Sequence, residues 1–175
     1  MRSMRKLAAG AVSCAAMALA LALAGCGGSS SHPVTTATNR TAVPADFSSG
    51  YEHAWGEMKR VAAEVNKTIK EVKRAQAKHR NVANSELARK FAIYAAQFEP
   101  AVIEFQGLTP PASVAPAFRS MAAAAAGVAA AMRSFSTDAN ANRASAGAHD
   151  LASYYSYAVT VDNAALTMYN KLGLK

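Results

Sequence analysis

Between residues 45 and 78, a stripe of mainly apolar side chains recurs at alternating intervals of four and three positions. The stripe is almost entirely apolar and consists of Phe47, Tyr51, Ala54, Met58, Val61, Val65, Thr68, Val72 and Ala75. Side chains three and four residues apart lie on the same side of an α-helix, so this spacing predicts one long amphipathic helix. The polar residues between the stripe positions are expected to face solvent.

Two further stripes follow this helix. One comprises Leu87, Phe91, Tyr94, Phe98, Ala101 and Phe105, and the other comprises Val114, Phe118, Met121, Ala125, Val128, Met132 and Phe135. Asn84 or Ser85 is expected to cap the first of these helices and Ser113 the second. Pro100 lies inside a stripe and is expected to bend or end that helix, because proline removes a backbone hydrogen bond. Pro116 falls in a first turn, where proline is tolerated.

A fourth helix is predicted from about residue 140 to Leu172. Its stripe comprises Leu151, Tyr154, Ala158, Val161, Ala165, Met168 and Leu172. Gly173 followed by Leu174 fits a Schellman cap at its end. Helices joined by short connections form antiparallel neighbours, so the sequence predicts an all-α, up-down-up-down four-helix bundle over residues 45–175. No strand pattern competes with this prediction.

The first 25 residues are organised as an export signal. Basic residues within the first six precede an uncharged stretch, residues 7–22, that is too short and alanine-rich for a stable membrane span. Leu23-Ala24-Gly25-Cys26 follows it and resembles the lipobox of bacterial lipoprotein precursors. The resemblance implies cleavage before Cys26, lipidation of its thiol, and anchoring to the membrane on the extracytoplasmic side of the cell envelope. Whether that membrane is inner or outer stays open.

Residues 26–44 are rich in Ser, Thr, Gly and Asn and show no apolar period. They are expected to form the lipidated N-terminus and a flexible tether, with a coil dimension of about 25 Å. Cys14 lies in the signal and Cys26 is expected to carry lipid, so the mature domain has no thiol for disulfides, metal binding or nucleophilic catalysis. With its alanine-rich helices, the mature part resembles small uncharacterised helical lipoproteins of GC-rich bacteria. That resemblance implies anchoring to the membrane and brings no activity with it.

Positive charge is concentrated in the first predicted helix. The full chain carries 19 Lys and Arg against 11 Asp and Glu. A cluster, hereafter the basic face, comprises Lys67, Lys70, Lys73, Arg74 and Lys78. It predicts either an anionic partner, such as lipid head groups, an acidic envelope polymer or a protein, or an ordinary solvated surface. Nucleic acid is not expected, because the chain is exported and lacks aromatic residues between the basic ones.

Catalytic and metal-binding residues do not form a recognisable set. The sequence contains neither Glu-x-x-His nor Cys-x-x-Cys-His. His53 and His149 could approach each other near an end of the bundle, in a structural or exposed role. Glu99 and Glu104 flank a proline without an evident partner, and Asp162 lies beside the fourth stripe at its solvent edge. The sequence therefore predicts no enzyme, cofactor or metal site.

Two hypotheses of function follow. The first is a non-enzymatic interaction or cell-envelope support module, indicated by the missing catalytic residues and by the basic face. The second is a carrier or sensor that binds a small apolar ligand in the bundle core. It is suggested by an aromatic and methionine-rich group: Trp55, Met58, Tyr154, Tyr155, Tyr157 and Met168. This second hypothesis expects an occluded cavity near Pro100 or the tyrosines.

Overall fold

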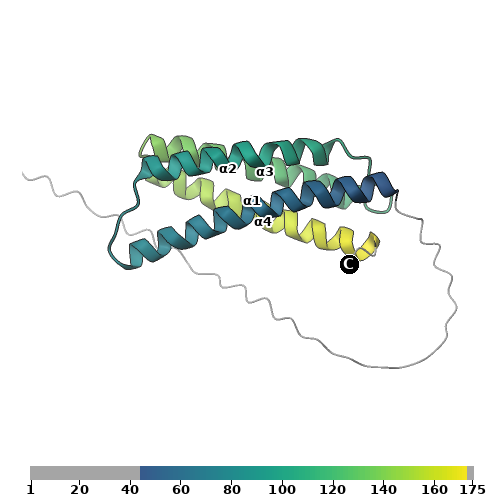
Figure 1. The fold of residues 1–175 in the computed structure, drawn as a ribbon, viewed down its shortest axis with the longest axis horizontal. Coiled ribbons are helices and arrows are strands. Elements are labelled where there is room, and N and C mark those ends of the chain that lie inside the picture. The colour runs from purple at the N-terminus through teal and green to yellow at the C-terminus, as the bar shows by residue number, and fades with distance from the viewer. Residues whose placement is uncertain (1–43, 173–175) are drawn as a thin grey trace, which may run out of the picture. The chain divides into compact units, whose positions relative to one another are not determined.

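The computed structural model describes residues 44–172, whose regular elements are four α-helices (Figure 1). They are α1 (Ala45–Ala77), α2 (Asn84–Gln106), α3 (Ala115–Asn140) and α4 (Ala144–Leu172). No strand occurs within this range. Consecutive helices are antiparallel, so the predicted all-α, up-down-up-down bundle is confirmed. The predicted signal peptide, Cys26, the tether up to residue 43 and the cap at Gly173 lie outside the described residues.

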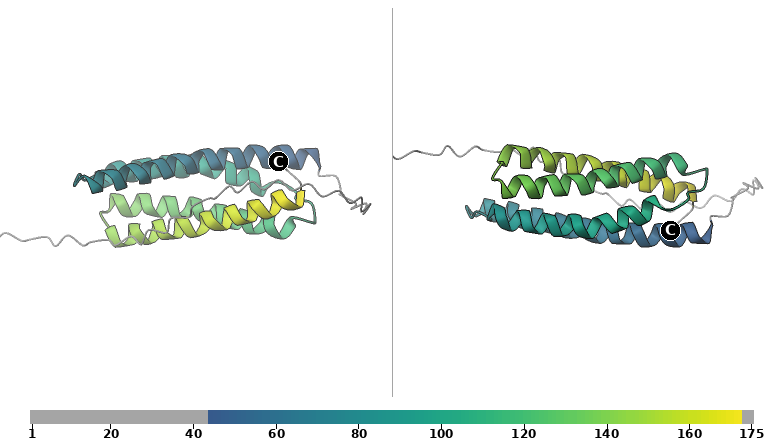
Figure 2. Two further views of the ribbon diagram at one scale, coloured as in Figure 1. Left: turned by 90° about the horizontal axis from the view of Figure 1, so that it is seen from below. Right: turned by 90° about the horizontal axis from the view of Figure 1, so that it is seen from above.

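The helices form two layers, each made of one hairpin (Figure 2). α1 and α2 form one layer, and α3 and α4 form the other. Cα atoms approach within 8 Å between α1 and α2, between α2 and α3, and between α3 and α4. No Cα atom of α1 lies within 8 Å of one in α4. The side of the bundle between the first and last helices is therefore more widely spaced than the other three.

The predicted stripes face inward and form one core. Its largest fully buried side chains are Tyr51, Phe91, Phe105, Met58, Met121, Met132 and Met168. The rings of Phe105 and Phe118 stack with centroids 4.4 Å apart, and those of Phe91 and Phe135 lie 4.2 Å apart. Each buried side chain of this size contributes about 1.5–3 kcal/mol, so packing alone can stabilise the bundle without disulfides.

The side-chain caps predicted at Asn84 or Ser85 and at Ser113 are wrong. α2 begins at Asn84 itself and α3 begins after Val114, and neither start has a side-chain cap. The Asn84 amide instead donates a hydrogen bond to Oδ1 of Asn142, at 2.9 Å. The Asn84 side chain therefore bonds to Asn142 of the other hairpin instead of capping α2. This bond joins two turns at one end of the bundle.

Pro100 does not end α2, which continues to Gln106. Pro100 and Ala96, whose carbonyl group loses its bond to the proline, are both exposed. Water can therefore replace the lost helical hydrogen bond at little cost. The continuous helix keeps Phe105 in line with the earlier core positions of α2.

The predicted boundary between the last two helices is also wrong. α3 extends to Asn140, where the fourth helix is predicted to begin, and α4 starts at Ala144. Ala139 is buried and adds one more core position to α3. The chain turns at Asn142, whose φ of 57° lies in the left-handed region that asparagine tolerates.

Candidate binding surfaces

The basic face lies on the exposed side of α1. All its members, Lys67, Lys70, Lys73, Arg74 and Lys78, are exposed. At 3.6 residues per turn, four of them fall within an arc of about 80° opposite the core stripe, with Lys73 farther round the helix. None forms an ion pair within residues 44–172, whereas Arg60, Lys90, Arg133 and Arg143 all do. The basic face is therefore solvated and carries net positive charge, with the exposed Glu71 beside it on the same helix.

The basic face lies far from the point where the described chain begins. Pro44 precedes the first residue of α1, and the basic face occupies the opposite half of that helix. A helix of 33 residues is about 50 Å long. The end of α1 nearest the basic face is also the end where α2 starts and where α3 turns into α4.

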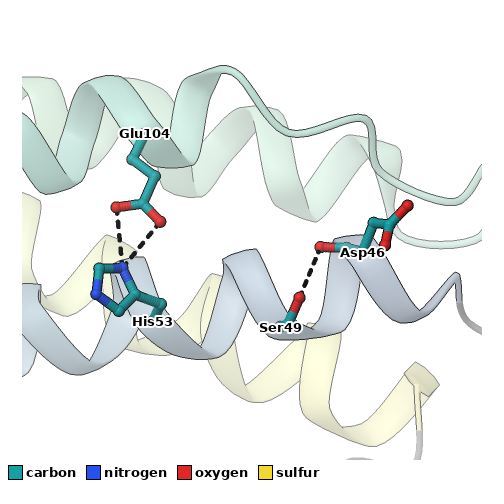
Figure 3. Close-up of polar contacts among 4 residues, drawn as sticks. All are labelled: Asp46, Ser49, His53 and Glu104. Carbon is teal, nitrogen blue, oxygen red and sulfur yellow. Dashed lines mark hydrogen bonds and ion pairs between the residues drawn. The ribbon is translucent and has the colours of Figure 1, made fainter.

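Acidic residues with no evident partner in the sequence do have partners in the bundle. Glu104 lies against His53, with Nδ1 of the histidine 2.9 Å from Oε1 and 3.0 Å from Oε2 (Figure 3). Glu99 pairs with Arg133 of α3. Both pairs are exposed, and such pairs typically contribute about 0–1 kcal/mol. Both pairs join neighbouring helices, one through an imidazole and the other through a guanidinium group.

The predicted approach of His53 to His149 is wrong. His53 lies in the first third of α1, whereas His149 lies near the start of α4. Because the helices alternate in direction, these positions are at opposite ends of the bundle. Among the residues the structure describes, no group of three or more His, Cys, Asp and Glu could hold a metal ion.

A groove opens between α1 and α4, on the widely spaced side of the bundle. Its volume is about 400 Å³. This α1–α4 groove is lined by Trp55, Met58, Lys59, Ala62, Ala63 and Asn66 of α1, by Phe98 of α2 and Val128 of α3, and by Tyr154, Tyr155, Ala158, Val159, Val161 and Asp162 of α4. All four helices thus contribute to a mostly apolar surface that reaches the centre of the bundle.

Two charged residues lie at the same level of the α1–α4 groove. The rings of Tyr51 in α1 and Tyr169 in α4 are 6.0 Å apart. Lys59 comes eight residues after Tyr51, and Asp162 comes seven before Tyr169, which brings them level in antiparallel helices. The ammonium group of Lys59 lies 5.5 Å from the ring centroid of Trp55, a cation–π distance.

Asp162 is exposed as a residue, as its position at the stripe's edge predicts. Partial desolvation of its carboxyl group nevertheless raises its pKa above the ordinary value. Burial likewise raises the pKa of the neighbouring Tyr154 phenol, and the nearby Tyr155 and Asp162 add to that increase. Tyr154 therefore stays neutral throughout the physiological pH range.

The sequence predicts an occluded cavity near Pro100 or the tyrosines, whereas the groove that lies beside the tyrosines is open. The space is an open groove, and Pro100 does not line it. Tyr154 and Tyr155 do line it, whereas Tyr157 covers Gly127 of α3 instead. Trp55 and Met58 lie in the lining together with these two tyrosines, whereas Met168, the last member of the expected group, is a core residue outside it.

The sequence does contain a signal for this groove. On α4, a second stripe with 4-3 spacing runs beside the core stripe: Ala148, Ala152, Tyr155, Val159, Asp162, Leu166 and Tyr169. Tyr155, Val159 and Leu166 are 41%, 58% and 60% exposed. An amphipathic helix with two adjacent apolar stripes has more apolar surface than one core contact covers.

A carboxyl pair lies at the turn between α3 and α4. Burial and the neighbouring carboxyl group of Asp138 raise the pKa of Asp150, while His149 and Arg143 oppose the increase. Arg143 binds Asp138 at 2.5 Å. Within the described range, Oδ2 of Asp150 is buried without a hydrogen-bond partner. Two carboxylates cannot satisfy each other unless one carries a proton, so this pair favours a shared proton.

The fold and these surfaces define a helical bundle with an exposed basic face and an open apolar groove. A scan against protein-family models finds no match, and searches of curated proteins and of solved structures likewise find none. Between residues 44 and 172, no helix combines the length and the apolar character needed to span a membrane.

Proposed function

We propose that the protein is a membrane-anchored, extracytoplasmic binding module without enzymatic activity, whose basic face contacts an anionic component of the cell envelope. The observation that carries this proposal is the set of exposed cations on α1 that have no ion-pair partner in the described part of the chain. Such charge attracts anionic polymers and surfaces over distances comparable with the screening length. The lipobox at residues 23–26 supports the anchor.

The position of the basic face favours an acidic envelope polymer as the partner. The tether joins α1 at one end, and the basic face begins about 33 Å farther along the helix, at Lys67. When the bundle stands on its tether, these cations point away from the anchoring membrane. Head groups of that membrane come within reach when the bundle lies flat or folds back, which the predicted flexible tether permits.

A triple substitution tests this proposal. Lys70→Gln, Arg74→Gln and Lys78→Gln remove positive charge from the basic face, and the control Arg60→Gln, Arg119→Gln and Lys171→Gln removes the same charge from dispersed positions. The protein used is the mature chain shortened to begin at residue 27. It lacks Cys26 and therefore carries no lipid, and it contains every core residue described above. Its adsorption to isolated acidic wall polymer and to anionic vesicles is measured at low and at high salt.

We expect the native chain and the dispersed triple variant to bind the polymer at low salt. Binding should fade as the screening length falls below about 8 Å, the value at physiological ionic strength. The basic-face variant should bind at least tenfold more weakly at unchanged or slightly higher stability, because like charges four residues apart repel. Equal binding by both variants, or no native binding at low salt, would contradict the proposal. Binding to vesicles alone would replace the polymer with lipid head groups.

A further inference from the structure

The dimensions of the α1–α4 groove limit what can occupy it. Its α1 wall runs from Trp55 to Asn66, which is about 16 Å at a rise of 1.5 Å per residue. A volume of about 400 Å³ over that length corresponds to a mean cross-section of about 25 Å². A helix with its side chains is about 10–12 Å across. The groove therefore cannot enclose a helix, and its volume suits a single extended chain.

The two charged residues of the groove lie toward one end of it. Lys59 and Asp162 lie level with each other in the half nearer Trp55, and the neutral Asn66 lies at the opposite end. Met58, Val128 and Val161 contribute apolar surface to the lining. An acyl chain is an extended apolar chain of the width that such a slot accepts, and burying it removes apolar surface from water. The ligand class that fits this arrangement is a single-chain molecule with a polar group at one end.

The two charges also restrict the nature of that polar end. A carboxylate or phosphate would be attracted by Lys59 but repelled by Asp162, and an ammonium group would meet the opposite combination. A hydroxyl group can accept a hydrogen bond from the Lys59 ammonium and donate one to the Asp162 carboxylate. A neutral head with adjacent hydroxyl groups is therefore complementary to both residues at once.

We propose that the α1–α4 groove binds a single-chain lipid with a neutral, hydroxyl-bearing head, of the monoacylglycerol type. The acyl chain lies along the apolar lining between α1 and α4, and the head lies between Lys59 and Asp162. This site is separate from the basic face, whose first member, Lys67, follows the last α1 residue of the groove lining.

The only tryptophan of the chain provides a direct measurement, because Trp55 lines the groove. Monolauroylglycerol, below its aggregation concentration, is added to the mature chain from residue 27 while Trp55 emission is recorded. The titration is carried out in high salt, which screens the basic face. If no lipid binds, the proposed function is therefore untouched, and if the basic face binds no polymer, the lipid proposal is untouched. We expect a saturable shift of Trp55 emission to shorter wavelength with one molecule bound per chain.

Two variants and one control identify the site. Ala62→Phe fills the groove and should weaken binding at least tenfold. Ala96→Phe adds the same side chain at an exposed position of α2 outside the groove and should leave binding unchanged. Asp162→Leu keeps the apolar lining and removes one head partner. It should weaken monolauroylglycerol binding and strengthen laurate binding, each about tenfold, because it removes both a hydrogen-bond acceptor and a repelling charge.

Several outcomes would overturn the proposal. They are the absence of any Trp55 shift with native protein, equal affinity of the Ala62→Phe and native chains, and laurate or dodecylammonium binding to the native chain as tightly as monolauroylglycerol. Sedimentation of the same samples tests whether a second copy of the chain occupies the groove. If the native chain is a dimer and Ala62→Phe is a monomer, a second copy covers the groove and the lipid assignment is wrong.

Discussion

Tyr51 is the most buried polar aromatic residue in the core. It is 0% exposed, and its ring packs against those of Phe47, Phe105 and Tyr169. Within residues 44–172, its hydroxyl group has no hydrogen-bond partner. Burial raises the pKa of the phenol above its ordinary value, with a smaller contribution from Tyr169, so the group stays neutral. A buried hydroxyl group without a partner retains its cost of desolvation.

Replacing Tyr51 with Phe should therefore raise the free energy of unfolding, by up to about 1 kcal/mol. The control is Tyr94→Phe, because the Tyr94 hydroxyl lies 2.7 Å from Oγ1 of the buried Thr68. That change should lower stability by about 1 kcal/mol, since it leaves the threonine unsatisfied. Urea denaturation followed by circular dichroism measures both. A Tyr51→Phe chain that loses as much stability as Tyr94→Phe would show that the Tyr51 hydroxyl has a partner.

Individual residues also mark the limit of what the sequence predicts. The 4-3 spacing places Tyr51 and Thr68 in the core because burial follows helical period. It does not reveal that Glu104 pairs with His53, since the two residues are separated by 51 positions and meet only when α1 and α2 pack. Likewise, Lys59 lies level with Asp162 because of how α1 is placed along α4. Local patterns contain no information on that placement.

Among the helices, α3 and α4 approach each other most extensively. Gly127 of α3 lies beneath the ring of Tyr157, and a Cβ atom at this glycine would lie 2.6 Å from Cδ1 and 2.7 Å from Cγ of that ring. Cγ is bonded to the Cβ atom of Tyr157. It cannot move far unless this side chain changes rotamer or α3 and α4 separate. The alanine-rich sequence around Gly127 allows the same close approach over neighbouring turns.

Two glycine substitutions separate this packing from helix propensity. Gly56→Ala should stabilise the protein by about 1 kcal/mol, because nothing lies within 4 Å of the new Cβ atom and alanine favours the helix. Gly127→Ala gains the same propensity but overpacks the contact with Tyr157, at a cost of about 1–3 kcal/mol. The net result should be a loss of stability. Thermal unfolding measures both changes. Equal stabilisation by the two substitutions would show that the Tyr157 ring moves aside without loss of stability.

At the level of elements, the apolar period predicts all four helices and places both ends of α1 within one residue. Boundaries fail where tertiary contacts compete with local signals. Asn84 bonds to Asn142 instead of capping α2, and α3 continues for another turn because Ala139 is buried. The proline in α2 does not end the helix, because its side of the helix faces solvent and water can take the freed carbonyl group. The sequence pattern alone does not show which side of the helix is exposed at that point.

At the scale of the whole molecule, the buried core residues of the part that the structure describes run from Phe47 to Met168. The predicted lipid anchor lies outside that interval, at Cys26. Cys26→Ser should therefore abolish lipidation without changing the helical content of the bundle. Mass spectrometry of the purified chain measures the attached lipid, and circular dichroism measures the helices. An unchanged lipid mass would contradict the lipobox assignment, and a loss of helicity would contradict the independence of the bundle from its anchor.

The uneven lengths of the helices have a consequence for how the molecule opens. The fully buried positions of α1 end at Thr68, nine residues before the helix itself ends. This last stretch is held by half-buried contacts and by its own backbone hydrogen bonds. Segments of this kind unfold locally at a lower free energy than the rest of a domain. Most of the basic face therefore lies on a segment that frays before the bundle melts, and a bound polyanion would suppress this fraying as it binds.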